Sequence, residues 1–432
     1  MKDKKVKEIL KEVLERITPP KDDLNFINNS LKHMLEEIKS RAKKSKLDME
    51  IFVGGSFAKG TVIKKMKYDV DVFLRYDKNK YKEQDISEIT KNLISGLGKI
   101  VNVHGSRDYF RIIISDNFFI ELIPVIKIKN IKEADNITDL SYSHVKYING
   151  KIKNDSLKKE IMLAKAFCHA QNCYGAESYI NGFSGYGLEL LIYHYKSFMK
   201  MLQELSKFNT KNNNKLIIDI EKHYKNKSQI LMDLNSSKMH SPIILIDPTF
   251  PQRNVLAALS NSTFEAFQQS AKQFLSSPSV KLFEQKKIDF NIEKANAPKR
   301  KEQFILIECE TLRQEGDIAG SKLLKFYNHL QEEVEKYFEL KKSGFEYNDK
   351  QKSKFYFSTK PKKEILSWGP FIKDIKNSQA FRKEHKKVLK KNGRLYIKYK
   401  MSETLNEFIK NWLKKNQEKI KDMSISNVKI LE

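Results

Sequence analysis

Residues 54–61 read Gly-Gly-Ser-Phe-Ala-Lys-Gly-Thr, residues 69–73 read Asp-Val-Asp-Val-Phe, and together they decide the fold. The first segment predicts a turn of small residues, whose backbone can approach phosphate groups closely. The second alternates polar and apolar residues as a strand does, so Asp69 and Asp71 leave the same face. Such carboxylates repel each other unless a cation lies between them, and Mg²⁺ prefers oxygen ligands of this kind. A solvated strand face explains a lone Asp-x-Asp better, but the glycine turn upstream favours a metal site beside a phosphate site.

A third acidic residue lies in a later apolar strand. Glu121 is flanked by apolar residues on both sides within residues 118–125. A charge in an apolar strand costs free energy unless it is paired or bound to a metal. Taken alone, Glu121 is better explained as an outward-facing residue. With Asp69 and Asp71 on a neighbouring strand, it becomes the predicted third metal carboxylate.

The chain carries a formal net charge of +27. Such an excess opposes compactness through self-repulsion, so it usually matches a polyanionic partner, and we expect that partner to be nucleic acid. The 26 Phe and 18 Tyr residues also suit stacking on unpaired bases. A lysine-rich composition bias of the organism is the alternative explanation for the charge.

The cysteines and the apolar segments predict a compartment. The chain has only Cys168, Cys173 and Cys309, too few for a disulfide framework or a four-ligand zinc site. We therefore expect reduced thiols in a cytoplasmic protein. The basic first residues lack the apolar core of a signal peptide, and no apolar run approaches membrane-spanning length, so we expect no membrane partner.

The periodicity of apolar residues predicts an α+β multidomain chain. In the first third we expect helices at 6–17, 22–44 and 85–97, and strands at 49–53, 69–75, 110–114 and 118–125. In the middle we expect helices at 156–173, 188–198 and from 262, and a surface insertion at 208–240, a helix flanked by loops, after which the chain regains order at 242–248. In the last third we expect helices at 318–340 and 381–391, and strands at 304–307, 354–358 and 394–399, the last of which ends the ordered sheet.

Three motifs together resemble the archaeal-type (class I) CCA-adding enzymes, which are tRNA nucleotidyltransferases of the DNA polymerase β-like superfamily. The first motif is the glycine turn with the Asp pair, which marks the superfamily broadly. The second joins residues 173–177 (Cys-Tyr-Gly-Ala-Glu) to residues 182–186 (Gly-Phe-Ser-Gly-Tyr). The third joins Asp247-Pro248 to Arg253-Asn254. The last two motifs are more specific to the family.

The resemblance implies three parts. Residues 1–143 would form a polymerase β-like palm, the nucleotidyltransferase head, with a mixed sheet and helices. Residues 144–284 would form a helical central domain that binds nucleotide and primer. Residues 285–432 would form an α/β body and tail that bind tRNA, after a polar boundary near residues 285–300.

The resemblance also implies an activity. Such an enzyme adds the terminal CCA of tRNA without a nucleic-acid template, using CTP and ATP, two Mg²⁺ ions and release of pyrophosphate. Asp69, Asp71 and Glu121 would be the catalytic residues and the metal ligands. The family generally has Asp where Glu121 stands, so the geometry of the metal site differs here by one methylene.

The resemblance places eight residues at the nucleotide. Lys59, His144, Lys165 and Tyr174 would contact the triphosphate with Ser56, and Arg253 would help to choose CTP and ATP. The full set is Gly55, Ser56, Lys59, Ser141, His144, Lys165, Tyr174 and Arg253. The family commonly has Arg at Lys59 and Thr at Ser141, and it often has His-Pro-Tyr where residues 108–110 read Asp-Tyr-Phe. A surface histidine, a helix lysine or a core aromatic explains His144, Lys165 or Tyr174 equally well one at a time; their joint order favours the pocket.

The basic last third would hold the acceptor stem and TΨC arm of tRNA through phosphate contacts. Its candidates are Lys362, Lys363, Arg382, Lys383, Lys386, Lys387, Lys390 and Lys391. A solvated charged helix is the competing explanation. The family resemblance is also compatible with a homodimer. Two other functions remain open: a non-templated tailing polymerase acting on other RNAs, and a relative that binds RNA without catalysis.

Overall fold

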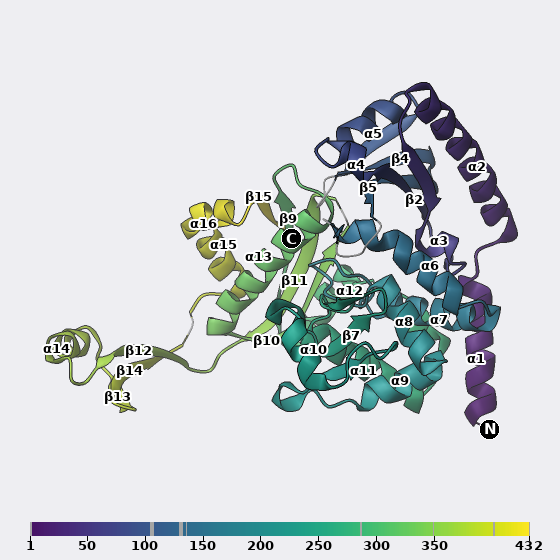
Figure 1. The fold of residues 1–432 in the computed structure, drawn as a ribbon. Helices are drawn as coiled ribbons and strands as arrows, with labels where there is room; N and C mark the ends of the chain where they lie inside the picture. Colours follow the sequence, from purple (N-terminus) through teal and green to yellow (C-terminus); the bar gives the residue numbers. More distant parts are fainter. Residues whose placement is uncertain are drawn as a thin grey trace. The chain divides into compact units, whose positions relative to one another are not determined.

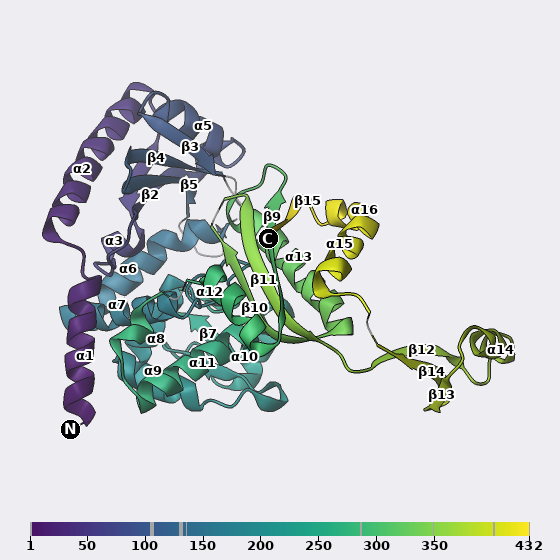
Figure 2. The same ribbon diagram turned by 180° about the vertical axis from the view of Figure 1, so that it is seen from behind.

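The computed structural model describes residues 2–103, 108–128, 133–134, 136–285, 287–348, 350–400 and 402–431. It forms two compact units. The first comprises Met1–Ala176 and Ile180–Lys286, and the second comprises Glu177–Tyr179 and Lys287–Glu432. Figures 1 and 2 draw the elements of both units from opposite sides.

The sheet that carries the predicted acids lies in the first unit and has the strand order β1-β2-β5-β4-β3. Its strands are β1 (Met49–Val53), β2 (Tyr68–Asp77), β3 (Lys99–Val103), β4 (Tyr109–Ser115) and β5 (Phe118–Lys127). The central pair β2–β5 is parallel, and the other neighbours are antiparallel. Helices α2 (Lys21–Lys44), α4 (Lys78–Tyr81) and α5 (Ile86–Ile94) accompany the sheet.

One face of this sheet is buried. Val70 and Val72 of β2 pack with Ile27, Leu31 and Ile38 of α2 in a single apolar core. Because side chains alternate along a strand, Asp69 and Asp71 are on the opposite face of β2. Burial of one face thus fixes which face carries the acids.

The rest of the first unit is mainly helical. Its helices are α1 (Lys2–Ile17), α3 (Gly55–Ala58), α6 (Ser141–Lys151), α7 (Asp155–Ala170), α8 (Gly185–Tyr195), α9 (Phe198–Lys207), α10 (Lys227–Asp233) and α11 (Asn261–Ser276). Short 3₁₀ turns are η2 (Ile137–Leu140), η3 (Lys211–Asn213), η4 (Ser236–Met239) and η5 (Val280–Phe283). A small sheet has the order β6-β7-β8, with β6 (Leu216–Ile218), β7 (Ile243–Asp247) and β8 (Phe250–Asn254). The core of this region is aromatic, with Phe167 packed edge-on against Phe198 and Phe274.

The second unit contains two sheets, ordered β10-β11-β9-β15 and β12-β14-β13. The strands are β9 (Gln303–Thr311), β10 (Phe338–Tyr347), β11 (Lys352–Pro361), β12 (Ile365–Phe371), β13 (Val388–Lys391), β14 (Arg394–Tyr399) and β15 (Ile425–Leu431). The helices are α12 (Phe290–Asn296), α13 (Gly316–Tyr337), α14 (Ile375–Glu384), α15 (Leu405–Lys415) and α16 (Gln417–Asp422), with the turn η6 (Pro298–Arg300). Helix α13 lies along the larger sheet in both views (Figures 1 and 2), and its Leu323, Phe326 and Leu330 share a core with Ile307 and Phe355.

The predicted α+β class is confirmed, but three element predictions in the second unit are wrong. The helix expected at 381–391 ends at Glu384, and residues 388–391 form β13 instead. The reason is a hairpin turn: Asn392 and Gly393 have φ of 50° and 72°, the left-handed values that an Asn-Gly turn adopts. The helix expected to reach residue 340 ends at Tyr337, where β10 begins. The strand at 394–399 does not end the ordered structure, because β15 follows and pairs with β9.

The segment at 208–240 is also more ordered than predicted. It contains the expected helix, α10, but also β6, which pairs in parallel with β7. Ile218, Ile230 and Leu234 are buried. The segment is therefore a part of the small sheet and its core, not a surface insertion.

Candidate functional site

The register of the central strands brings the three predicted acids to one face. In the parallel pair β2–β5, Asp71 lies opposite Glu121 and Asp69 lies opposite Phe119. Paired residues of neighbouring strands point to the same side of a sheet, so Asp69, Asp71 and Glu121 share the face opposite Val70 and Val72. The sequence could suggest two adjacent strands, but not this register.

The surroundings of Asp71 and Glu121 raise the pKa of both carboxyl groups. Burial, together with the nearby charges of Glu121 and Asp69, raises the pKa of Asp71 to about 7. Burial also raises the pKa of Glu121, although Arg111 opposes the rise. Raised carboxylate pKa values mark a place where negative charge is incompletely compensated, which a divalent cation would correct. The donor set of three carboxylates therefore fits Mg²⁺.

Two of the acids are paired with cationic side chains. Nζ of Lys65 is 2.9 Å from Oδ1 of Asp69, and Nε of Arg111 is 2.8 Å from Oε1 of Glu121. Within the described ranges, no three His, Cys, Asp or Glu side chains are placed to hold a metal ion as they stand. Lys65 and Arg111 thus offset part of the charge of these acids, and the metal assignment remains a prediction.

The glycine turn is tied directly to the acid strand. The backbone N–H of Gly54 donates to the carbonyl of Asp71 at 2.8 Å, and Gly55 has a φ of +63°. The N–H of Thr61 closes the turn by donating to the carbonyl of Ser56 at 3.0 Å. Gly55 and Ser56 thus open α3 immediately beside Asp71, as the predicted phosphate site requires.

The predicted lysines of the triphosphate pocket meet at a residue that the sequence analysis missed. Nζ of Lys59 donates to Oε2 of Glu189 at 2.6 Å, and Nζ of Lys165 donates to Oε1 at 2.9 Å. Lys165 also donates to Oγ1 of Thr61 at 2.8 Å. The signal for Glu189 was present in the sequence, because it is a lone charge within the apolar run at 188–192.

A second polar cluster brings together two predicted residues. Asp247 is fully buried, and its Oδ2 accepts from Nε2 of His144 at 3.0 Å and from Nη1 of Arg253 at 2.8 Å. Its Oδ1 accepts from the hydroxyl of Tyr186 at 3.2 Å and from the N–H of Thr249 at 2.9 Å. Asp247 and Tyr186 lie in the quoted motifs but were not predicted as site residues.

The protonation of this cluster follows from burial. Burial lowers the pKa of His144 in spite of Asp247, so the imidazole is neutral at pH 7. Burial acts to raise the pKa of Asp247, but the hydrogen bond from His144 and the charge of Arg253 outweigh it and hold that pKa below its ordinary value. His144 also stacks on Tyr186 with ring centroids 4.2 Å apart. The cluster is therefore an ion pair of Asp247 with Arg253, to which a neutral His144 is hydrogen-bonded.

Tyr174 and Ser141 occupy positions next to these clusters. The ring of Tyr174 stacks on His169 of α7 with centroids 3.9 Å apart. Burial lowers the pKa of His169 to about 4, with Lys65 and Lys165 adding to the shift, so this ring is neutral at pH 7. Ser141 begins α6, one turn before His144.

The predicted RNA-binding residues all lie in the second unit. Lys362 and Lys363 follow β11, Arg382 and Lys383 end α14, Lys386 and Lys387 precede β13, and Lys390 and Lys391 are on β13. All but Lys362 are exposed. The sheet β12-β14-β13, which includes β13, exposes the aromatic rings of Trp368 and Phe371 on β12. Basic and aromatic side chains thus share this sheet, as single-stranded or looped RNA would require.

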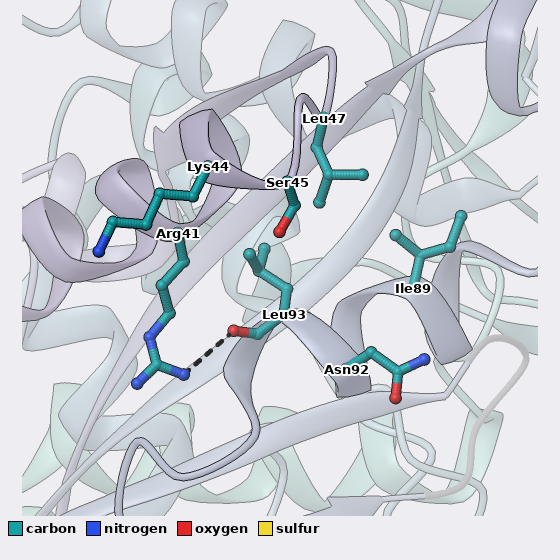
Figure 3. A pocket seen from close by; sticks show the side chains of 7 residues that line it. All are labelled: Arg41, Lys44, Ser45, Leu47, Ile89, Asn92 and Leu93. Carbon is teal, nitrogen blue, oxygen red and sulfur yellow. Dashed lines mark hydrogen bonds between the residues drawn. The ribbon is translucent and has the colours of Figure 1, made fainter.

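A pocket of about 430 Å³ lies elsewhere, between the end of α2 and α5 (Figure 3). Its lining residues are Arg41, Lys44, Ser45, Leu47, Ile89, Asn92 and Leu93. Arg41 donates to the carbonyl oxygens of Leu93 and Ser95. None of the predicted site residues lines it.

Two family models match consecutive parts of the first unit. Residues 31–165 match the family model of the nucleotidyltransferase domain, and residues 159–284 match that of the tRNA nucleotidyltransferase second domain. The CCA-adding enzyme of Nanoarchaeum equitans is 38% identical over 251 residues. Residues 31–284 thus match the nucleotidyltransferase domain and the tRNA nucleotidyltransferase second domain in succession, and the chain is similar to archaeal CCA-adding enzymes.

Two further CCA-adding enzymes are similar to this chain. The enzyme of Methanocaldococcus jannaschii is 32% identical over 286 residues, and that of Saccharolobus solfataricus is 31% identical over 276 residues. The matched stretches cover 58% to 64% of this chain, and they span about 60% of the length of these curated relatives.

Solved structures support the fold. A cytoplasmic RNA terminal U-transferase superposes with a TM-score of 0.50 at 14% identity, covering 66% of this chain and all of that one. The Cid1 poly(U) polymerase bound to Mg and 3′-dATP superposes with a TM-score of 0.51 at 14% identity, covering 65% of this chain and 98% of that one. At this identity the likeness concerns the fold alone. No helix among the described residues is long and apolar enough to cross a membrane.

Proposed function

We propose that this chain adds CCA to the 3′ end of tRNA, transferring CMP, CMP and AMP from CTP and ATP with release of pyrophosphate. The observation that carries the proposal is the register that sets Asp71 opposite Glu121, directly beside the glycine turn. The matches of residues 31–165 and 159–284 to the two domain models also support the proposal.

Asp69, Asp71 and Glu121 would hold the two Mg²⁺ ions. Bound there, the ions supply activation of the attacking 3′-hydroxyl and compensation of charge on the leaving oxygen. Lys65 and Arg111 pair with two of these acids, Asp69 and Glu121. Gly55 keeps the backbone close to Asp71, so that the phosphates and the acids meet.

The remaining residues would bind and orient the nucleotide. Ser56, Lys59 and Lys165 are placed at or beside the glycine turn, where charge-assisted hydrogen bonds to phosphate oxygens are strongest. Tyr174 and Ser141 would complete the pocket around the phosphates. His144 would contact a phosphate while Arg253 donates to the edge of the base, and Asp247 anchors both side chains.

The second unit would hold the acceptor stem and the TΨC arm. The exposed lysines of β13 and the aromatic side chains of the same small sheet support this assignment. Because such contacts displace counterions, binding should weaken steeply as salt rises. All three cysteines are free and buried, which fits the expected cytoplasmic location.

A primer-extension assay tests the function. The protein is incubated with Mg²⁺, CTP, ATP and three tRNA transcripts that lack the whole CCA, the final CA or only the final A. Ordered completion of each end supports the proposal, and Asp71→Ala should abolish it while leaving tRNA affinity nearly unchanged. Homopolymer tails on unrelated RNA would replace the proposal with a tailing polymerase. Binding of tRNA without incorporation would replace it with an RNA-binding function.

A further inference from the structure

Glu189 is a charged residue buried in an otherwise apolar helix. It lies on α8 within the run Leu-Glu-Leu-Leu-Ile at 188–192, every residue of which is fully buried. A buried carboxylate costs several kcal/mol unless cations and donors surround it. The free energy that Glu189 costs must therefore be offset by the residues that contact it.

Those residues come from two other elements of the same unit. Lys59 follows α3 in the glycine turn, and Lys165 belongs to α7. Their ammonium groups contact different oxygens of the one carboxylate, at 2.6 Å and 2.9 Å. Burial acts to raise the pKa of Glu189, but Lys165 and Lys59 outweigh it and leave that pKa below its ordinary value. Glu189 is thus the ionic link between the glycine turn and α7.

The cluster retains the means to bind an anion. Two ammonium groups and one carboxylate carry a net charge of +1. Each ammonium has three N–H donors; Glu189 takes one from each, and Thr61 takes a second from Lys165. Lys59 is also close enough to Asp71 to lower the pKa of that carboxyl, so it is near the acids as well as near Glu189. A phosphate at the glycine turn would meet both lysines without displacing the carboxylate behind them.

We propose that Glu189 is a positioning residue for the nucleotide triphosphate. It holds Lys59 and Lys165 charged and extended at the glycine turn, and it does not itself touch the nucleotide. This inference rests on the proposed function, because it takes the triphosphate as the ligand of the two lysines.

The test compares CTP binding by the full-length protein and by Glu189→Gln, which keeps the volume and removes the charge. Calorimetric titration with CTP and Mg²⁺ at pH 7.5 should give a Kd at least tenfold higher in the variant. In primer extension, the KM for CTP should rise more than kcat falls, since the lysines bind substrate and transition state alike.

A pH series separates positioning from loss of folding. The groups that interact with Lys165 include Glu189, Thr61, Lys59, Lys65 and His169; burial lowers the pKa of Lys165, and Glu189 opposes this. Without Glu189 the ammonium should lose its proton at lower pH. The Kd of Glu189→Gln should therefore rise further between pH 7.5 and 9, while the wild-type Kd stays nearly constant. Glu189→Asp, which restores the charge, should recover part of the affinity.

Glu221→Gln is the matched control, because Glu221 also pairs with a lysine, Lys151, at 2.9 Å within the same unit. It should leave the Kd for CTP unchanged.

The inference is overturned if wild type binds and incorporates CTP while Glu189→Gln has the same Kd and the same pH dependence. It is also overturned if the variant loses only kcat and melting temperature. Should wild type bind CTP but add nothing to tRNA, the proposed function fails while the Glu189 result can still be read from binding. If Glu189→Gln does not fold, Thr61→Val is the second variant, because the Thr61 hydroxyl contacts both Lys165 and Oε1 of Glu189. It should show the same pH-dependent weakening on a smaller scale, and an unchanged Kd in it would count against the inference.

Discussion

A β-carbon on Gly55 would lie 1.8 Å from Oδ2 of Asp71. No contact between real atoms is that short, so the two residues exclude any side chain at position 55. A side chain at position 55 would therefore force the carboxylate of Asp71 to move.

Gly55→Ala should lower nucleotide incorporation by about a hundredfold, the loss that a displacement of roughly 1 Å in a catalytic group can cause. The left-handed backbone adds a strain of about 1 kcal/mol. Gly96→Ala is the control, because Gly96 has a similar φ of +75° and no atom within 4 Å of the added carbon. Equal losses of incorporation in the two variants would mean that backbone strain, not the contact with Asp71, explains the effect.

Asp71→Asn should stabilise the metal-free protein at pH 8. The pKa of Asp71 is raised from 3.8 to about 7, so the folded protein keeps a proton that the unfolded chain releases. Stability therefore falls as the pH rises between these values, and it stays low above pH 7. In EDTA the variant should melt at least about 3 °C above wild type at pH 8, with the difference vanishing near pH 4.

Added Mg²⁺ completes that experiment. It should raise the melting temperature of the wild type at pH 8, because a cation relieves the repulsion among Asp69, Asp71 and Glu121. It should raise that of Asp71→Asn much less. A Mg²⁺-induced shift of equal size in both proteins would place the metal elsewhere.

Asp247→Asn should weaken discrimination between nucleotides. Oδ2 of Asp247 holds both His144 and Arg253, so the variant frees the guanidinium that is proposed to contact the base. The ratio of kcat/KM for CTP over UTP should fall about tenfold, within the 1–3 kcal/mol of a good base contact. Thr249→Val removes only a contact to Oδ1 and should change this ratio far less. A uniform loss for all nucleotides in Asp247→Asn would indicate a structural role alone.

Removing two charges from β13 should weaken tRNA binding in a salt-dependent way. In the double variant Lys390→Ala with Lys391→Ala, the slope of log K against log salt should shrink by about 2, since each phosphate contact contributes about 0.9. Lys7→Ala with Lys11→Ala removes the same charge from exposed positions on α1 and should leave the slope nearly unchanged. Identical slopes in the two double variants would show that net charge, not β13, governs affinity.

The first unit could be predicted further than the second because its elements follow simple patterns. β1 matches the prediction residue for residue, and β2 and β5 enclose theirs, since each has an unbroken apolar face. In the second unit β10 and β13 are rich in lysine and hide their alternation, so helices were expected there. The Asn392-Gly393 turn was the local signal that could have corrected β13.

The sequence predicted which residues form the site, but not which residues contact them. The positions of Asp69, Asp71 and Glu121 on one face follow from periodicity and from the neighbouring strands. Glu189 and Asp247 were missed because their importance lies in distant partners: Lys59 is 130 residues from Glu189, and His144 is 103 residues from Asp247. Periodicity describes one element at a time, whereas these contacts join separate elements.

The pairing of β15 with β9 has a consequence for biosynthesis. Thr311 of β9 faces Ile425 of β15, so one side of β9 has no strand beside it until the ribosome has made the segment that contains residues 425–431. At 5–20 residues per second, that wait is roughly 6 to 24 s. An open strand edge on a nascent chain is a place where another chain can add. Variants that slow translation of this stretch should therefore yield more aggregate without changing any contact of the finished protein.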